Sequence, residues 1–120
     1  MVTLQDVKEM RYIREEILSL CEREREIARR ISDGEDGAKA LEKVRAELSL
    51  QRQRLAKREA AATAYIGTVP DGLMRLILTY RFIEGLSWLA VARRIGGVHT
   101  ADSVKKAFYR FWAAEIRKRK

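Results

Sequence analysis

The chain has 120 residues, of which 47% are hydrophobic and 35% are charged, and its net charge is +8 at pH 7. That length fits one small domain with an appendage, the hydrophobic share excludes wholesale disorder, and the charged share is typical of long exposed helices. The only cysteine, Cys21, excludes an intramolecular disulfide and a thiolate metal cluster, and its apolar neighbours predict a buried small side chain. The apolar runs are too short to span a membrane and the N-terminus lacks the apolar segment of a signal peptide, so we expect a cytoplasmic protein.

The first predicted element is a long helix from Leu4 to Ile31. No useful β alternation occurs anywhere, so the expected fold class is all-α. Apolar residues recur along this helix at three- and four-residue steps, as in a coiled coil, with Glu24 as one polar interruption. Asp33-Gly34 and Asp36-Gly37 then break the helix with turn residues. The apolar stripe consists of Met10, Ile13, Ile17, Leu20, Ile27 and Ile31.

A second long helix is predicted from Ala38 to about Ile66, with Gln51 as the polar gap in its stripe. A short loop between two stripes of similar length implies an antiparallel helical hairpin over residues 1–66. Two helices bury little surface by themselves, so the hairpin is expected either to dimerise through residues 4–66 or to pack on the rest of its own chain. The stripe of the second helix is Leu41, Val44, Leu48, Leu55, Ala62 and Ile66.

Gly67 to Gly72 form the predicted boundary, because a proline at position 70 disfavours helix before it and Asp71 can cap the helix that follows. Residues 67–120 are therefore expected to form a separate three-helix domain. Its first helix is predicted from Leu73 to about Ile83. The side chains expected in its core face are Leu73, Leu76, Ile77, Tyr80 and Phe82.

Residues 85–110 predict two capped helices across a tight glycine turn, which is the pattern of a helix-turn-helix. Ser87 is expected to cap the first helix, Gly96-Gly97 to end it, and Thr100 to cap the second. Trp88 and Trp112 are interpreted as core or edge packing, with base stacking as the less favoured alternative. The buried faces are predicted to be Leu89, Val91, Ala92 and Ile95 on the first helix, and Val104, Ala107, Phe108 and Phe111 on the second.

The positive charge lies in the C-terminal half of the chain. Residues 1–66 contain 14 Lys/Arg and 13 Asp/Glu, whereas residues 67–120 contain 11 Lys/Arg and four Asp/Glu. A cationic helix-turn-helix domain attracts polyanions, of which double-stranded DNA is the commonest. The alternative is a basic surface that serves only solubility.

A recognisable pattern lies within residues 65–112 and consists of Tyr65-Ile66, Pro70-Asp71, Arg75, Tyr80-Arg81-Phe82, Gly85-Leu86-Ser87-Trp88, Val91-Ala92, Ile95-Gly96, Thr100 through Val104, and Arg110. Through these residues the segment resembles the sigma-region-4-like helix-turn-helix proteins of phages and prophages of Gram-positive bacteria, a group that includes the ArpU-like regulators. The resemblance implies DNA binding through the last helix and a role in phage transcription within the bacterial host cell, associated with the nucleoid. Regions that would open a promoter or bind the polymerase core are missing from the sequence, which argues against a complete sigma factor.

In a helix-turn-helix, the first residues of the second helix reach base edges and flanking groups contact phosphates. Ser103 and Lys106 are the candidates for base contacts, because hydroxyl and ammonium groups can meet base edges. Thr100 and the free N–H groups of the helix start suit a phosphate. Asp102 either stabilises the helix dipole, the favoured role, or accepts from a cytosine amino group. The candidate DNA-binding residues are Ser87, Arg93, Arg94, Thr100, Ser103, Lys105, Lys106, Tyr109 and Arg110.

Other interpretations have weaker support. Arg93 and Arg94 either clamp phosphates or face solvent, and the tail Arg117–Lys120 is expected to be flexible and to add salt-dependent affinity. His99 is expected to be a turn residue, and no nucleophile, phosphate-loop or metal motif occurs, so we expect neither an enzyme nor a cofactor. Two rival functions share the predicted fold: docking on RNA polymerase or another phage protein, and DNA packaging as a small terminase-like accessory.

Overall fold

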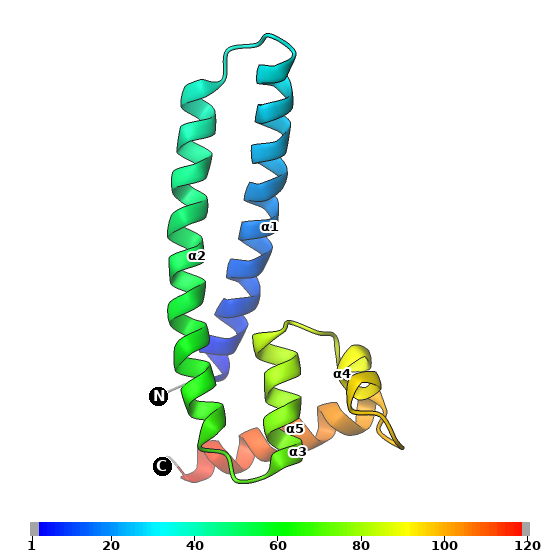
Figure 1. The fold of residues 1–120 in the computed structure, drawn as a ribbon. Helices are drawn as coiled ribbons and strands as arrows, with labels where there is room; N and C mark the ends of the chain where they lie inside the picture. The colour runs from blue at the N-terminus through cyan, green and yellow to red at the C-terminus, as the bar shows by residue number, and fades with distance from the viewer. Residues whose placement is uncertain (1–2, 119–120) are drawn as a thin grey trace. The chain divides into compact units, whose positions relative to one another are not determined.

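A computed structural model describes residues 3–118, and its ribbon is shown in Figure 1. No strand occurs in that part of the chain, so the all-α class is confirmed. The two long N-terminal helices lie side by side as the predicted hairpin. The elements are α1 (Leu4–Ser32), α2 (Ala38–Gly67), α3 (Gly72–Leu78), the π-helical segment η1 (Thr79–Ile83), α4 (Trp88–Ile95) and α5 (Ala101–Lys118).

The described chain divides into two compact units. One unit is the hairpin segment Lys8–Glu59, and the other combines residues 3–7 with residues 60–118. The sequence placed the division between residues 66 and 67, where the helical pattern stops. In the structure, Val7 of α1 and Ile66 of α2 are both buried in the core of the C-terminal unit. The ends of the two long helices thus contribute apolar surface to that unit.

An apolar seam holds the hairpin unit together. Residues 33–37 connect α1 to α2, as their turn residues predict. Leu20 on α1 and Val44 and Leu48 on α2 are buried along the seam, because successive apolar residues three or four apart share one helix face. Cys21 packs beside them, as predicted, but it is half-buried and not fully buried.

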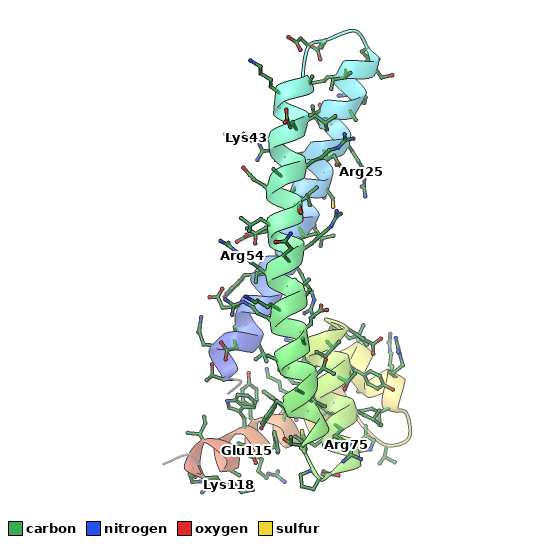
Figure 2. All side chains as sticks on the ribbon, turned by 60° about the vertical axis from the view of Figure 1, so that its left-hand side comes forward. Arg25, Lys43, Arg54, Arg75, Glu115 and Lys118 are labelled. Atoms are coloured by element: carbon green, nitrogen blue, oxygen red, sulfur yellow. The ribbon has the colours of Figure 1, made fainter. Side chains whose placement is uncertain are left out.

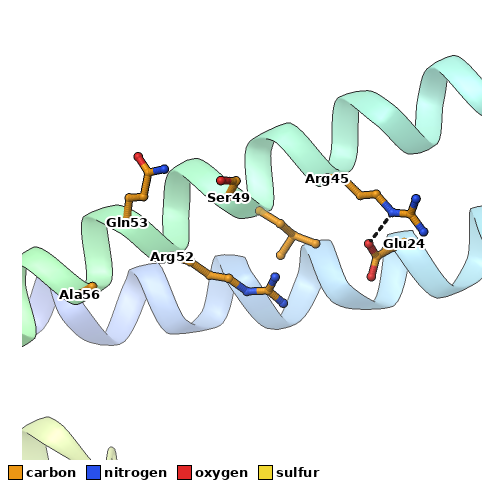
Figure 3. A pocket seen from close by; sticks show the side chains of 7 residues that line it. Glu24, Arg45, Ser49, Arg52, Gln53 and Ala56 are labelled. Atoms are coloured by element: carbon orange, nitrogen blue, oxygen red, sulfur yellow. Dashed lines mark hydrogen bonds and ion pairs between the residues drawn. The ribbon is translucent and has the colours of Figure 1, made fainter.

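The polar interruption of the first stripe is explained by an ion pair across the hairpin. The Glu24 carboxylate accepts from Nε of Arg45 at 3.1 Å (Figure 3), and both side chains keep access to water. An exposed pair of this kind contributes about 0–1 kcal/mol, so Glu24 is tolerated on the seam without stabilising it strongly. The polar gap on α2 differs, because Oε1 of Gln51 is buried without a hydrogen-bond partner among the described residues.

Charged side chains cover the outer surface of the hairpin. Arg25, Lys43 and Arg54 are exposed there (Figure 2). Towards the end of α1, Nη2 of Arg29 donates to the Glu26 carboxylate at 2.8 Å, and this hydrogen bond, more than any other effect, holds the pKa of Glu26 below its ordinary value. The hairpin surface therefore mixes positive and negative charge at close range.

The core of the C-terminal unit lies where α3, α4 and α5 meet. Ile77 of α3, Val91 of α4 and Phe108 of α5 are at most 1% exposed. Trp112 is buried and Trp88 is partly buried against the same core, so the predicted packing role of both indoles is confirmed. The other buried members of this core are Val7, Ile66, Val69, Met74, Leu78, Ala92 and Val104.

Three leucines expected in this core are instead at the surface, and the prediction was wrong for them. Leu73, Leu76 and Leu89 are 37%, 44% and 50% exposed. On α3 the buried side chains are Met74 and Leu78, together with the predicted Ile77. Five of the seven residues of α3 are apolar, so spacing alone could not indicate which face is buried.

The segment η1 extends the predicted third helix with a wider hydrogen-bond pattern. The N–H of Glu84 donates to the carbonyl of Thr79, five residues back, at 3.0 Å. Arg81 then ties down the connection to α4: its Nη1 donates to the carbonyl of Leu86 at 2.9 Å, and its guanidinium lies 4.6 Å from the centre of the Trp88 ring. These contacts hold the start of α4 against the rest of the unit.

Truncating Leu48 should destabilise the hairpin, whereas truncating Leu50 on the same helix should not. Leu48 is 1% exposed and Leu50 is 47% exposed. Leu48→Ala removes buried methyl groups and is expected to lower the free energy of unfolding by about 2–5 kcal/mol, against about 0.5 kcal/mol or less for Leu50→Ala. Urea unfolding followed by helical circular dichroism measures both. Equal destabilisation by the two substitutions would contradict the seam described here.

Candidate nucleic-acid interface

Helix α4 begins as its sequence predicts, and all of its predicted buried face except Leu89 packs on the core. The Ser87 hydroxyl oxygen accepts from the N–H of Ala90 at 3.1 Å, which confirms the predicted cap. Val91 and Ala92 are buried at 0% and 2% exposure. Because the Ser87 hydroxyl is used at the helix start, its oxygen is already engaged before any ligand approaches.

A five-residue connection, residues 96–100, joins α4 to α5. Gly96 and Gly97 have φ angles of 81° and 67°, a region that residues with a Cβ rarely adopt. The N–H of Gly96 donates to the carbonyl of Ala92 at 2.9 Å and closes the last turn of α4. His99 lies in this connection, as expected for a turn residue.

A reciprocal pair of hydrogen bonds fixes the start of α5. The N–H of Ser103 donates to Oγ1 of Thr100 at 3.1 Å, and the N–H of Thr100 donates to Oγ of Ser103 at 2.8 Å. The Ser103 hydroxyl itself donates to the carbonyl of Thr100 at 3.0 Å. The predicted Thr100 cap is confirmed, and Ser103, one of the two candidates for base contact, is committed to the same cap.

The inner face of α5 is anchored by aromatic side chains. The Phe108 ring centre lies 5.4 Å from that of Trp88 and 5.7 Å from that of Trp112, distances typical of packed aromatic pairs. Val104 is also buried, and Ala107 and Phe111 are partly buried, so the predicted inner face is confirmed. This anchoring decides which residues of α5 face outward.

The outer face of α5 carries the candidate cations. Lys105, Lys106 and Arg110 are exposed, and Tyr109 is 49% exposed. Nζ of Lys106 lies 3.0 Å from the Asp102 carboxylate, one helical turn away. Lys105 and Arg110 form no ion pair with the described residues, so their charges are available to a ligand.

The two arginines of α4 differ in their surroundings. Nη1 of Arg94 lies 3.4 Å from the Glu84 carboxylate, and its guanidinium lies 5.2 Å from the centre of the Tyr80 ring. Arg93 is exposed and has no acidic partner among the described residues. Arg93 is therefore better placed than Arg94 to contact a phosphate. Both line a shallow surface groove together with Leu86, Ser87, Leu89 and Ala90.

The basic tail is less free than the sequence predicted. Arg117 and Lys118 belong to α5, which corrects the expectation of a flexible segment from residue 117 onward. Glu115 accepts from the Tyr65 hydroxyl at 3.2 Å, and Nζ of Lys118 lies 3.4 Å from the same carboxylate (Figure 2). Arg119 and Lys120, the rest of the predicted tail, lie outside the described residues.

Residues 3–118 support neither a metal site nor a membrane-spanning helix. No group of three or more His, Cys, Asp or Glu side chains there could hold a metal ion. None of the helices combines the length and the apolar content that crossing a lipid bilayer requires. Comparisons of the chain with protein-family models, curated proteins and solved structures find no match.

Sequence reasoning did not anticipate the ion pair between Asp102 and Lys106. A signal for it was present, because acidic and basic residues four apart on a helix are neighbours. The engagement of the Ser103 hydroxyl also had a signal, since hydroxyl residues at the first turn of a helix favour caps over external contacts.

Substituting Gly96 should strain the connection between α4 and α5, whereas substituting Gly67 should not. A Cβ at either position meets no atom within 4 Å, but only Gly96 has a positive φ. Gly96→Ala is expected to lower the free energy of unfolding by about 1–3 kcal/mol through backbone strain alone. Gly67→Ala is expected to leave stability unchanged or to raise it by about 0.4–1 kcal/mol. Urea unfolding compares the two, and a fully stable Gly96→Ala protein would rule out the strained turn.

Proposed function

We propose that this protein is a phage-derived transcriptional regulator that binds double-stranded DNA sequence-specifically, with α5 as the recognition helix. The observation that carries the proposal is the pairing of two capped helices across a glycine turn with an exposed cationic face on the second helix, on which Lys105 and Arg110 have no acidic partner among the described residues. A recognition helix of a helix-turn-helix has these two properties, a fixed orientation and an outer face that suits the major groove.

Electrostatics support this proposal. Five Lys/Arg and two Asp/Glu lie on α5, and one of the acids, Glu115, is held by Tyr65 and Lys118. Each cation that neutralises a phosphate releases a condensed counterion, so such a helix gains affinity for DNA in a salt-dependent way. The hairpin gains no comparable affinity, because residues 1–66 carry nearly equal numbers of basic and acidic side chains.

The proposed roles follow the position of each residue. Lys106 lies within the first two turns of α5 and donates to base edges, while Lys105, Tyr109 and Arg110 contact the phosphate backbone. Thr100 and Ser103 hold the helix start, so that its free N–H groups can receive a phosphate. On α4, Arg93 is the main phosphate contact, with Ser87 and Arg94 in supporting positions.

The hairpin is proposed to dimerise the protein through residues 4–66. Its seam is closed between α1 and α2, yet Leu18 and Leu50 remain 63% and 47% exposed on its outer faces. A symmetric dimer would present two recognition helices, as palindromic operators require. Such a regulator would act in the cytoplasm of the bacterial host, associated with the nucleoid.

The proposal predicts that cations of α5, and not cations in general, support DNA binding. Binding to a pool of random duplexes is titrated at two salt concentrations with the wild type, with Lys105→Ala/Lys106→Ala/Arg110→Ala, and with Arg25→Ala/Lys43→Ala/Arg54→Ala. The two variants lose the same charge from different units. The α5 variant is expected to lose binding and to flatten the dependence of log affinity on log salt by about 0.9 for each lost phosphate contact. The hairpin variant should bind as the wild type does.

The outcomes separate the proposal from its rivals. Enrichment of one sequence by the wild type, lost in the α5 variant, supports a sequence-specific regulator. Tight binding without enrichment, together with a ring-sized oligomer in light scattering, would instead favour a DNA-packaging accessory. Absence of binding at low salt would refute DNA binding and favour docking on RNA polymerase or another protein, which a pull-down with purified polymerase would test.

A further inference from the structure

The ion pair between Asp102 and Lys106 is an unexpected feature of a surface proposed to meet DNA. Their side chains are 73% and 68% exposed, and the carboxylate lies 3.0 Å from Nζ. An exposed pair four residues apart on a helix contributes little to stability, because water solvates both charges well. Both groups can therefore exchange this partner for another at small cost.

A carboxylate at this place opposes non-specific DNA binding. DNA carries one negative charge per about 1.7 Å of helix axis, so an acid at the first turn of a recognition helix is repelled unless it receives a hydrogen bond. In the major groove, the exocyclic amino groups of cytosine and adenine are the donors that bases offer. Asp102 is therefore least unfavourable in the major groove where a base amino group donates a hydrogen bond to its carboxylate.

The neighbouring hydroxyls do not compete for this role. The oxygens of Thr100 and Ser103 are engaged in the reciprocal cap of α5. Asp102 is the acidic residue in the first turn of α5, and no cap bond to it appears among the hydrogen bonds of that turn. Its carboxylate, paired with Lys106, is consequently the side-chain acceptor at the helix start that the cap does not use.

We infer that Asp102 and Lys106 together recognise one G·C base pair, an inference that rests on the proposed DNA binding by α5. A G·C pair presents the cytosine N4 amino donor beside the guanine O6 and N7 acceptors in the major groove. The carboxylate accepts from cytosine N4 and the ammonium donates to guanine. The ion pair therefore holds an acceptor and a donor side by side before DNA arrives, and it makes Asp102 a determinant of specificity as well as a repellent of other sequences.

The test is a parallel selection from random duplexes with the wild type, Asp102→Ala, Asp102→Asn and Asp36→Asn. Asp36 lies in the connection between the hairpin helices, so Asp36→Asn removes one negative charge from the hairpin unit and leaves the sequence of α5 unchanged. The wild type and Asp36→Asn are expected to enrich the same site with a G·C pair at one particular position. Exchanging that pair for A·T should weaken wild-type binding on the order of tenfold to hundredfold.

The Asp102 variants are expected to change the base-pair preference at this one position. Asp102→Ala should accept any base pair there and bind unrelated duplexes more tightly than the wild type. Asp102→Asn should shift the preference towards A·T, because an amide pairs with adenine N6 and N7. A role of Asp102 in helix stability alone would leave base preference unchanged, and thermal unfolding of each variant measures that role separately.

Different results would refute the proposed DNA binding and the inference about Asp102 and Lys106. A wild type that binds no duplex at low salt would refute the proposed function, and this inference with it. A wild-type site that all four proteins enrich identically would overturn the inference while leaving DNA binding intact. So would an Asp102-dependent position that prefers A·T in the wild type.

Discussion

Phe108 is 1% exposed, and its ring centre lies within 6 Å of those of Phe82, Trp88 and Trp112. Large aromatic side chains supply much of the burial in a small core, so this cluster fixes the rotation of α5 about its own axis. Rotation of α5 by one residue would turn Phe108 away from the core and bring Lys105 to the place of Val104 or Arg110 to that of Phe111, and burying either charge costs far more than a surface contact contributes. The outward direction of the α5 cations is thus a consequence of aromatic packing.

The start of α5 shows that caps and recognition compete for the same chemical groups. Thr100 and Ser103 cap the helix reciprocally, which stabilises it but uses both hydroxyl oxygens as acceptors and the Ser103 O–H as a donor. The Ser87 hydroxyl is engaged in the same way on α4. Under the proposed function, base contacts come from side chains of the first two turns that the cap does not use, and these are the charged Asp102 and Lys106. A charged contact is stronger when matched and more unfavourable when mismatched than a hydroxyl contact, so this division of roles favours discrimination over general affinity.

Much of the fold followed from sequence because its signals were local. The caps at Asp71, Ser87 and Thr100 and the glycine turn after α4 each depend on residues within a few positions of one another. The wrong predictions concerned burial, which depends on contacts between helices. Leu73 and Leu89 are as apolar as their buried neighbours, and only the position of the other helices determines which of them reaches the core. For the candidate site, sequence indicated the exposed cations correctly, but the partners of Arg94, which are Glu84 and the Tyr80 ring, emerged only from three-dimensional contacts.

Opposite and like charges are arranged differently on the hairpin and on α5. On the hairpin, Glu24 pairs with Arg45 and Glu26 pairs with Arg29 and Arg30, so like charges are kept apart by opposite ones. On α5, Lys106 and Arg110 lie four residues apart, a spacing at which like charges repel by about 0.2–0.5 kcal/mol. Folding alone favours the arrangement found on the hairpin. Asp102, which pairs with Lys106, reduces this repulsion in the free protein. Under the proposed function, bound DNA relieves the repulsion that remains, and Asp102 restricts which base pair fits.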